Sequence, residues 1–287
     1  MKEQHLEYIY EPFAETEEYR KLNSAIVARW LEVMRDNGAR GIDRLLDIAT
    51  GVGTMVTLFL DNLPKGWDTP SVVCLDMSEE ALEQTRIRLG PSVSDLKLVH
   101  STVQEMSMPD NSVDVAVWGN GIHYLNAQGQ EEALRSIKRV VKPQGWFVFN
   151  SAFYQESRPP ETSTFYRSQV RKAVEQLRSI GVHRQERTAR PEASDFLPRS
   201  HYEELMQLVG FKIVEAKETA SHMYRTAWEH ISGFHQYAAG ALHGYDPEAA
   251  ADAMRKAVAP ALEEHGTRDE HNIPYVQRNW LSIIAHA

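Results

Sequence analysis

Cysteine, long apolar runs and excess positive charge are all scarce in this sequence. Cys74 is the only cysteine among 287 residues, so the chain can form neither an intrachain disulfide nor a metal site built from cysteines. No apolar run approaches the ~18 residues that cross a bilayer, so we expect no membrane span. The 31 basic and 40 acidic side chains give a formal net charge of −9. This balance argues against nucleic acid as a partner, because phosphate binding needs a dense basic surface.

The remaining composition is typical of a globular protein, with 42% hydrophobic and 25% charged residues. The length predicts one large domain, or one domain with a cap. The N-terminal residues Met1–His5 are polar and lack the apolar core of a signal peptide. We therefore expect a cytoplasmic enzyme that acts on small molecules. A homo-oligomeric state is compatible with the sequence.

Short apolar runs alternate with amphipathic stretches between residues 44 and 151. The apolar runs are 45–49, 71–75, 96–100, 113–118 and 146–149, and the helical stretches are 53–62, 78–89 and 127–141. Runs that are apolar on both faces suit parallel strands buried between two helix layers. The alternation therefore predicts a doubly wound α/β sheet.

The flanking segments predict further domain boundaries. Residues 1–43 form an N-terminal helical segment, because Tyr19, Leu22, Ile26, Trp30 and Val33 recur at helical spacing. The core should span 44–152 and resume at 199–219 and 277–287, with strands at 211–216 and 280–285. The intervening segments 153–198 and 220–276 should be two helical cap insertions, with helices near 163–180 and over 223–264, the latter interrupted at 244–247. Insertions of this size are usually functional.

A glycine turn follows the first predicted strand at Gly51-Val52-Gly53, and a helix begins directly after it. Glycines let the backbone approach a ligand closely, and a new helix presents free N–H groups. Such a turn can also be purely structural. Asp76 favours a ligand-binding role for this turn, because a carboxylate at the end of the second strand can accept hydrogen bonds from both ribose hydroxyls of a nucleoside.

A pyridine-nucleotide site would call for a third glycine, yet Val56 stands in that place. Asp47, four residues before Gly51, would repel a pyrophosphate and attract a cationic ligand. The sign of this charge favours S-adenosylmethionine over NAD.

Residues 47–53, Asp76, 106–114, 120–124 and 139–146 together resemble the motifs of the class I S-adenosylmethionine-dependent methyltransferases, in the group related to quinone-biosynthesis C-methyltransferases. The resemblance covers about two-fifths of the chain. It implies a mostly parallel, seven-stranded Rossmann-like methyltransferase sheet. It departs from the family pattern at Thr50, where many relatives have Cys or Gly, and at Thr102, where an acid often reads the adenine amine.

The resemblance also implies roles for residues around the cofactor. Asp76 should hold the ribose, and Asn120 should lie beneath the sulfonium. The methionine end should be lined by Asp47, Ala49, Gly51 and Gly53, and the adenine by Met77, the backbone of Thr102 and Val103, and Gln104. Residues 1–20 could fold over the cofactor as a lid, with Tyr19 reaching the methionine carboxylate, although ordinary packing of the first helix explains Tyr19 equally well.

Three residues are candidates for the catalytic step. His123 and Tyr124 follow the fourth strand, at the edge of the sheet where ligands bind. Glu156 lies at the start of the first cap. Packing or capping is an equally good interpretation of His123. We predict no metal site, because the histidines of the second cap do not share a helix face.

These observations predict S-adenosylmethionine-dependent methyl transfer to a small, hydrophobic metabolite at a carbon, oxygen or nitrogen acceptor. The pathway would be biosynthetic, secondary metabolism included. The two caps and the N-terminal segment should enclose the acceptor. The alternatives are an NAD(P)-dependent oxidoreductase, and a cofactor-binding protein or cyclase that transfers no methyl group.

Overall fold

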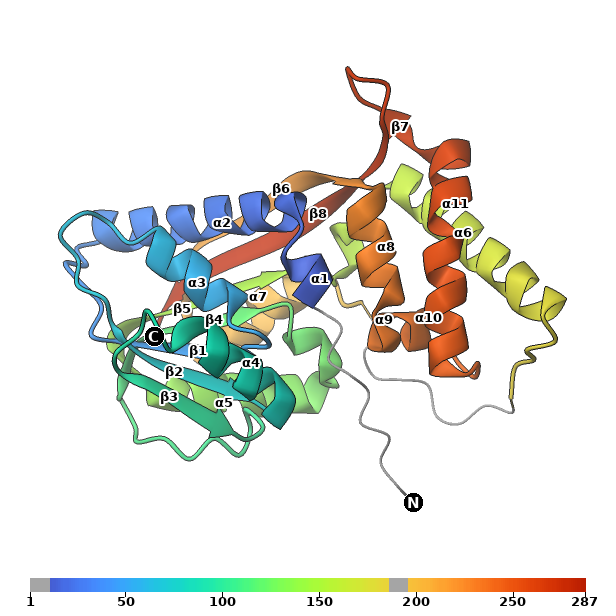
Figure 1. Cartoon of the computed structure of the whole chain (residues 1–287). Helices are drawn as coiled ribbons and strands as arrows, with labels where there is room; N and C mark the ends of the chain where they lie inside the picture. Colours follow the sequence, from blue (N-terminus) through green and yellow to red (C-terminus); the bar gives the residue numbers. More distant parts are fainter. Residues whose placement is uncertain (1–10, 186–195) are drawn as a thin grey trace. The chain divides into compact units, whose positions relative to one another are not determined.

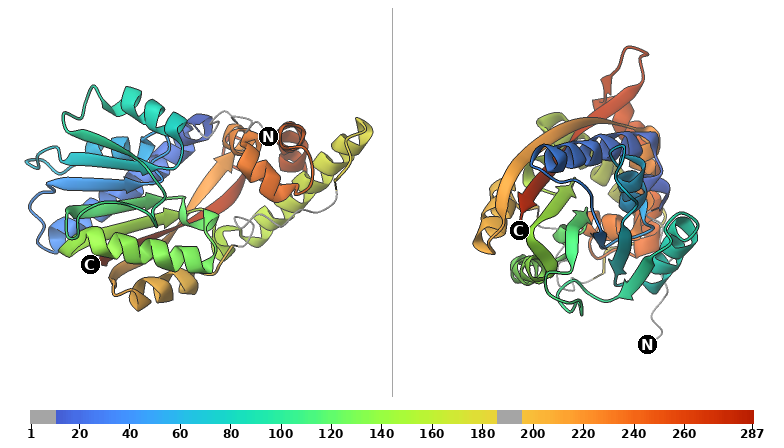
Figure 2. Two further views of the ribbon diagram at one scale, coloured as in Figure 1. Left: turned by 90° about the horizontal axis from the view of Figure 1, so that it is seen from below. Right: turned by 90° about the vertical axis from the view of Figure 1, so that its left-hand side faces the viewer.

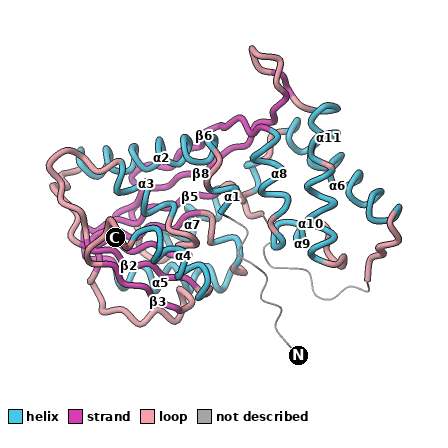
Figure 3. Tube along the Cα trace, viewed as in Figure 1, coloured by secondary structure: helices cyan, strands magenta, loops and turns pink. Residues whose placement is uncertain are grey.

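The computed structural model describes residues 11–185 and 196–287, which fall into two compact units. The sheet unit comprises residues 20–155, 196–219 and 280–287. The helical unit comprises residues 11–19, 156–185 and 220–279. Figure 3 shows strands concentrated in the first unit and helices in the second. Half of the proposed N-terminal lid, residues 1–10, and part of the first cap, residues 186–195, lie outside the described residues.

The central sheet has the strand order β3-β2-β1-β4-β5-β8-β6. These strands are β3 (Leu96–His100), β2 (Ser71–Asp76), β1 (Arg44–Ile48), β4 (Val113–Gly119), β5 (Val141–Ser151), β8 (Pro274–His286) and β6 (Lys212–Tyr224). The first five are parallel, and β8 pairs with β5 antiparallel. A short strand, β7 (Thr267–Arg268), pairs with β8. The predicted doubly wound, mostly parallel, seven-stranded sheet is confirmed.

Helices cover both faces of this sheet. α2 (Glu17–Asp36) and α3 (Thr54–Asp61) lie on one face, and α5 (Ala127–Val140) and α7 (Arg199–Leu208) lie on the other (Figures 1 and 2). The apolar sides of α5 and α7 join strand residues in one buried cluster. α4 (Glu79–Leu89) packs on β2 and β3, and Ser78 caps it by accepting a hydrogen bond from the N–H of Ala81 at 3.1 Å. The central strands β1, β2, β4 and most of β5 are therefore buried, as their apolar residues require, whereas the edge strands β3 and β6 are partly exposed.

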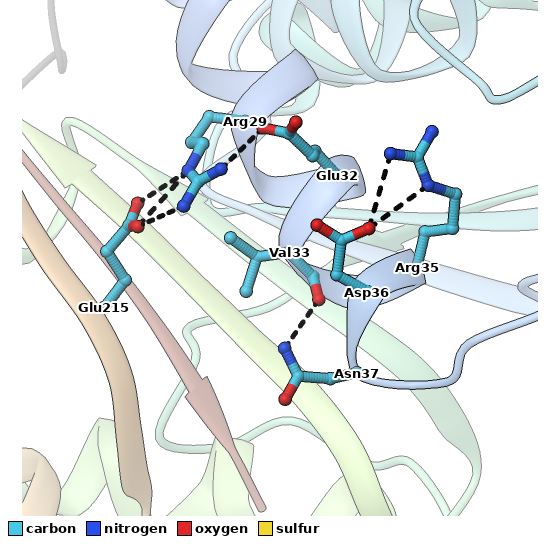
Figure 4. A network of polar contacts seen from close by, with 7 residues as sticks. All are labelled: Arg29, Glu32, Val33, Arg35, Asp36, Asn37 and Glu215. Carbon is cyan, nitrogen blue, oxygen red and sulfur yellow. Dashed lines mark hydrogen bonds and ion pairs between the residues drawn. The ribbon is translucent and has the colours of Figure 1, made fainter.

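α2 is held to the sheet unit by its apolar side and by two polar contacts. Trp30 and its helical neighbours of the predicted stripe are buried, and the indole N–H of Trp30 donates to the hydroxyl of Ser282 at 2.8 Å. Arg29 donates through two nitrogens to the Glu215 carboxylate, at 3.1 and 2.6 Å (Figure 4). Because this ion pair is solvent-exposed, burial of the apolar stripe contributes more to the attachment.

The helical unit contains α1 (Glu11–Ala14), α6 (Pro160–Ser179), α8 (Arg225–Gly233), α9 (His235–Ala241), α10 (Pro247–Lys256) and α11 (Val258–His265). Small side chains, mainly alanines, fill much of the core between α6, α9 and α10. The helical stretch predicted over 223–264 is thus four separate helices. One break is explained by α10, which Asp246 caps by accepting from the N–H of Ala249 at 2.9 Å, with Pro247 at its first position.

Three strands are markedly longer than the sequence predicted. β5 was expected over 146–149 and spans Val141–Ser151. β6 was expected over 211–216 and continues to Tyr224, and β8 was expected over 280–285 and begins at Pro274. Both extensions run into the range expected for the second cap. They are rich in polar residues, so they lack the apolar run by which a buried strand is recognised.

Two searches of the described residues gave negative results. None of the helices there has the length and apolarity that a membrane span needs. No group of three histidine, cysteine or acidic side chains in residues 11–185 and 196–287 could hold a metal ion.

Candidate cofactor-binding site

The turn between β1 and α3 is built from left-handed backbone. Ala49, Gly51 and Gly53 have φ angles of 52°, 57° and 77°. Such angles are readily adopted by glycine and disfavoured by most other residues. A Cβ atom at Gly53 would also lie 3.1 Å from Cδ1 of Leu89, so this position is tightly packed. α3 starts without a side-chain cap at Gly53, which leaves backbone N–H groups at its first turn for a ligand.

Asp47, near the end of β1, is almost completely buried, with 1% of its surface exposed. Its Oδ2 accepts a hydrogen bond from the hydroxyl of Thr50 at 2.6 Å. Burial raises the pKa of Asp47 to about 7, partly offset by this hydrogen bond, and the nearby charge of Asp76 raises it further. A cationic ligand would favour the ionised form of this carboxyl group.

Asp76 ends β2 and is also buried. Its Oδ2 accepts from the N–H of Gly51 and its Oδ1 from the N–H of Ser78, both at 2.9 Å. Burial raises the pKa of Asp76, and these backbone hydrogen bonds oppose the shift. The side chain of Thr85 donates to the Gly51 carbonyl at 2.8 Å. The glycine turn is therefore fixed by the end of β2 and by α4.

The residues expected at the adenine lie after β2 and β3. Met77 is 74% exposed, which is unusual for a large apolar side chain. The N–H of Ser101 donates to the carbonyl of Asp76 at 3.0 Å and so ties the segment after β3 to the end of β2. Thr102 contacts Glu105 through its hydroxyl at 3.2 Å. Val103 is buried in the core, so its backbone but not its side chain is suited to contact a ligand. Gln104 is half-buried.

Asn120 follows β4 and is buried, with a left-handed φ of 50°. Its side-chain oxygen accepts from the N–H of Ala152 at 2.8 Å, and its own N–H donates to the carbonyl of Asn150 at 2.9 Å. A Cβ atom at Gly121 would lie 3.0 Å from Cβ of Ala49. The absence of a side chain at Gly121 thus allows the loop after β4 to approach the turn after β1.

His123 and Tyr124 form a short 3-10 helix after this loop with Ile122. His123 is 4% exposed and stacks on Phe153, with ring centroids 4.1 Å apart and an interplanar angle of 23°. The ring centroids of Tyr124 and His123 are also 4.1 Å apart. Burial raises the pKa of the Tyr124 hydroxyl, and so does the charge of Asp76. This aromatic group is compatible with both interpretations of His123, a catalytic role and a packing role.

The strand order brings most of the expected site residues to one edge of the sheet. The strands β3, β2, β1 and β4 are adjacent and parallel, so their carboxyl ends share this edge. The residues placed there are Asp47, Ala49, Gly51, Gly53, Asp76, Met77, Thr102, Val103, Gln104, Asn120, His123 and Tyr124. Ligands bind at this edge in open α/β sheets.

Tyr19 and Glu156 belong to the helical unit instead. Tyr19 is buried, with its ring centroid 5.2 Å from that of Phe13 in an edge-to-face arrangement. Glu156 has an exposed side chain, and its carbonyl accepts from the amide of Asn279 at 3.2 Å. Their roles remain as predicted from the sequence, and the contacts just given add no support to either.

Two residues of the sheet-edge site were missed in the sequence. Thr50 was noted only as a departure from the family pattern, yet its hydroxyl donates a hydrogen bond to Asp47. This hydrogen bond could have been inferred from the position of Thr50, which lies at the turn three residues after Asp47. Thr85 lies 34 residues from Gly51 and gave no signal, because only the fold brings them together.

The sheet-edge residues fit an adenosyl cofactor that carries a positive charge. The left-handed turn keeps side chains away from a ligand, and Asp76 presents a carboxylate beside that turn. The exposed Met77 offers an apolar surface next to it. Two buried carboxylates would repel a pyrophosphate and attract a sulfonium or an ammonium group.

The fold is that of the class I S-adenosylmethionine-dependent methyltransferases. Residues 46–149 match the family model described as a methyltransferase domain. The segment is therefore a methyltransferase domain of that class.

Similar proteins agree with this assignment. A demethylmenaquinone methyltransferase of Staphylococcus aureus is 32% identical over 138 residues, which cover 46% of this chain and 55% of that protein. The chain thus matches about half the length of such relatives. A protein of Bacillus halodurans assigned as a methyltransferase has a TM-score of 0.54 at 13% identity, covering 90% of this chain and 97% of that one. The [4+2]-cyclase SpnF has a TM-score of 0.52 at 16% identity, covering 93% and 80%. Both structural matches show the fold alone.

Proposed function

We propose that this protein transfers a methyl group from S-adenosylmethionine to a small, hydrophobic metabolite. The observation that carries the proposal is the placement of two buried carboxylates, Asp47 and Asp76, at the ends of adjoining strands beside one left-handed glycine turn. S-adenosylmethionine has a ribose, a sulfonium and an ammonium group, and it has no phosphate. Its charge is therefore complementary to this turn, whereas that of NAD is not.

Each residue of the site has a proposed place around the cofactor. Asp76 accepts hydrogen bonds from the ribose hydroxyls, and Asn120 lies beneath the sulfonium. The remaining assignments are Asp47, Ala49, Gly51 and Gly53 at the methionine, Met77, Thr102, Val103 and Gln104 at the adenine, and Tyr19 at the methionine carboxylate. Met77 is the adenine-side residue with the most accessible apolar surface.

The cofactor supplies an electrophilic methyl group, so the protein has to position the acceptor in line and keep water out. His123 is the proposed general base or positioning group for the acceptor, with Tyr124 and Glu156 as the other candidates. The aromatic surroundings of His123, with Phe153 stacked on it, suit a hydrophobic acceptor. An unprotonated imidazole could accept the proton that an acceptor hydroxyl or amine loses.

The acceptor class is also supported by the relative in Staphylococcus aureus, which is named for a quinone-type acceptor, demethylmenaquinone. We infer a related biosynthetic role for this chain, in the cytoplasm. We assign the selection of the acceptor to the two caps predicted from the sequence, residues 153–198 and 220–276.

The proposal is tested first by calorimetry with S-adenosylhomocysteine, with NADH as the control ligand. Binding of S-adenosylhomocysteine alone supports it, and binding of NADH alone contradicts it. The second step uses S-adenosylmethionine labelled on the methyl group, incubated with the protein and a metabolite extract. Label in an organic-soluble product supports a hydrophobic acceptor. Cofactor binding with no transfer to any metabolite would favour a non-methylating protein of this fold, as SpnF is a cyclase.

A further inference from the structure

A buried glutamine follows the short helix that carries His123 and Tyr124. Gln130 lies near the start of α5, and only 2% of its surface is exposed. Glutamine is usually found at protein surfaces, because burial deprives its amide group of hydrogen bonds with water. A glutamine in the core therefore needs partners for both ends of the amide. The residues that supply them here belong, like Gln130 itself, to the sheet unit.

The amide nitrogen of Gln130 reaches back to both ends of the 3-10 helix. Its Nε2 donates to the carbonyl of Leu125 at 2.9 Å and lies 3.4 Å from the carbonyl oxygen of Ile122. The N–H of Leu125 donates to the same Ile122 carbonyl at 3.1 Å. Backbone hydrogen bonds in a 3-10 helix have poor geometry, so a short one is weakly stabilised by its own backbone. Gln130 adds contacts from α5 that close this segment.

The amide oxygen of Gln130 faces α7. Its Oε1 lies 2.9 Å from Nε2 of His201. Because the two backbone carbonyls only accept hydrogen bonds, the NH₂ group must face them, and Nε2 of His201 must carry the hydrogen that it shares with the oxygen. Burial lowers the pKa of His201, and the charge of Glu204 opposes this shift. The neutral ring donates from Nε2 as well as the charged ring does, so His201 orients the amide in either form.

The segment held by Gln130 carries both candidate groups for the acceptor. The N–H of Tyr124 donates to the carbonyl of Gly121 at 3.2 Å, which joins the 3-10 helix to the loop after β4. The ring of His123 lies against those of Tyr124 and Phe153. A shift of the backbone over residues 122–125 would therefore move both candidate rings.

We propose that Gln130 is a positioning residue, which fixes the backbone of residues 122–125 and thereby the rings of His123 and Tyr124, with His201 orienting its amide. Catalytic groups have to be held to within about 0.5 Å of the productive geometry by the residues around them. Gln130 is buried, so it acts through the segment and not on a ligand. Its effect on methyl transfer rests on the proposed function, whereas its effect on the segment does not.

Hydrogen exchange measured by NMR tests the effect on the segment in the full chain. Gln130→Met keeps a long, flexible side chain and removes the amide group. We expect the backbone amides of Tyr124 and Leu125 to exchange at least ~10-fold faster, while those of β1 and β4 stay at their wild-type rates. Gln128→Met is the matched control, because the Gln128 side chain is exposed on the same helix and binds Glu132. Unchanged exchange at both amides in folded Gln130→Met would overturn the proposal.

A second variant tests the contribution of α7. His201→Phe keeps a planar ring and removes the donor to the Gln130 oxygen. It should accelerate exchange at Tyr124 and Leu125 in the same direction and to a smaller extent. If Gln130→Met does not fold, His201→Phe decides the matter, and wild-type exchange at both amides would then overturn the proposal.

A double-mutant cycle separates positioning from general stability. Single-turnover transfer is followed with methyl-labelled S-adenosylmethionine and the metabolite extract. Gln130→Met should lower the rate by about 10-fold or more, with affinity for S-adenosylhomocysteine within a few-fold of wild type. In a His123→Phe background the same change should cost no more than about 2-fold, because the group that Gln130 positions is already lost. An equal loss in both backgrounds would overturn the action through His123.

The two kinds of measurement fail separately. Faster exchange at Tyr124 and Leu125 in a protein that transfers no methyl group would support the role of Gln130 in the segment and overturn the proposed function. Wild-type exchange in Gln130→Met, combined with methyl transfer at the wild-type rate, would overturn the positioning role alone.

Discussion

The carboxylate of Asp76 accepts a hydrogen bond from the backbone N–H of Gly51 at 2.9 Å. One residue ends the second strand, and the other lies at the middle of the turn after the first. The same carboxylate that we assign to the ribose therefore also holds the glycine turn in its left-handed form. If Asp76 also binds the ribose, cofactor binding and the conformation of this turn are coupled through one side chain.

Replacement of Asp76 by alanine should weaken S-adenosylhomocysteine binding by about 1.5–3 kcal/mol, which is roughly 10- to 150-fold in Kd. The loss combines the ribose hydrogen bonds with the tether to Gly51. Calorimetry measures it, and Glu79→Ala is the control, since Glu79 is an exposed acid in the first turn of the next helix. Unchanged affinity in a folded Asp76→Ala protein would refute the ribose assignment.

Replacement of Gly51 by valine should abolish cofactor binding. The φ angle of 57° at Gly51 is strongly disfavoured for a β-branched residue, and the new side chain would also occupy the approach to the turn. The readout is the rise in unfolding midpoint with S-adenosylhomocysteine. Gly41→Val is the control, because Gly41 has no positive φ and a Cβ there would meet nothing within 4 Å. Stabilisation by the cofactor product that persists in Gly51→Val would place the site elsewhere.

The raised pKa of Asp47 predicts a pH dependence of stability. The pKa is 3.8 in a free carboxyl group and about 7 in the folded protein, so the folded state holds this proton more tightly. The free energy of unfolding should therefore fall as pH rises from about 4 to about 7, by an amount on the order of 4 kcal/mol from this group. Urea unfolding compares wild type with Asp47→Asn, which cannot titrate. Parallel pH profiles for the two proteins would contradict the shift.

The same group predicts proton release when the cofactor binds. A positively charged ligand favours ionised Asp47, so binding near or below pH ~7 should expel a fraction of a proton. Calorimetry with S-adenosylmethionine in two buffers of different ionisation enthalpy measures this number. Asp47→Asn should reduce it, and a buffer-independent enthalpy in the wild type at that pH would show that Asp47 does not respond to the ligand.

Strands β1, β2 and β4 and the second half of β5 could be predicted from the sequence because they are mostly buried and apolar. The edge strand β3 is only partly buried, and it was recognisable by Leu96, Leu98 and Val99. The last two could be predicted only in part. In β6, residues such as Lys217 and Glu218 interrupt the apolar pattern, since this strand is at the edge of the sheet. Its extent depends on pairing with β8, which lies far away in the sequence and leaves no local signal.

The candidate site divides in the same way. Asp47, Asp76 and the glycine turn were recognisable, because each has a fixed position relative to a strand end. The hydrogen bond of Thr85 to the turn joins distant segments and required the fold. Histidine at position 123 was recognisable as a candidate, but its burial against Phe153 was not.

His123 is the residue for which catalysis and packing can be separated most directly. Its ring stacks on Phe153, so alanine at this position would remove a possible base and also leave a cavity. We expect His123→Ala to lower turnover by 10²-fold or more, the usual range for loss of a general base, while affinity for S-adenosylhomocysteine changes by only a few-fold. Glu156→Ala tests the other ionisable candidate by the same two measurements.

The informative comparison is His123→Phe, which keeps a planar ring against Phe153 and removes both nitrogens. If His123 accepts a proton or positions the acceptor by a hydrogen bond, His123→Phe should lose turnover to the same extent as His123→Ala, with stability close to wild type. If it only packs, His123→Phe should retain wild-type turnover and His123→Ala should mainly lower the unfolding midpoint. Thermal unfolding and single-turnover kinetics with labelled cofactor distinguish the two, because packing loss lowers the midpoint and base loss lowers the rate of methyl transfer.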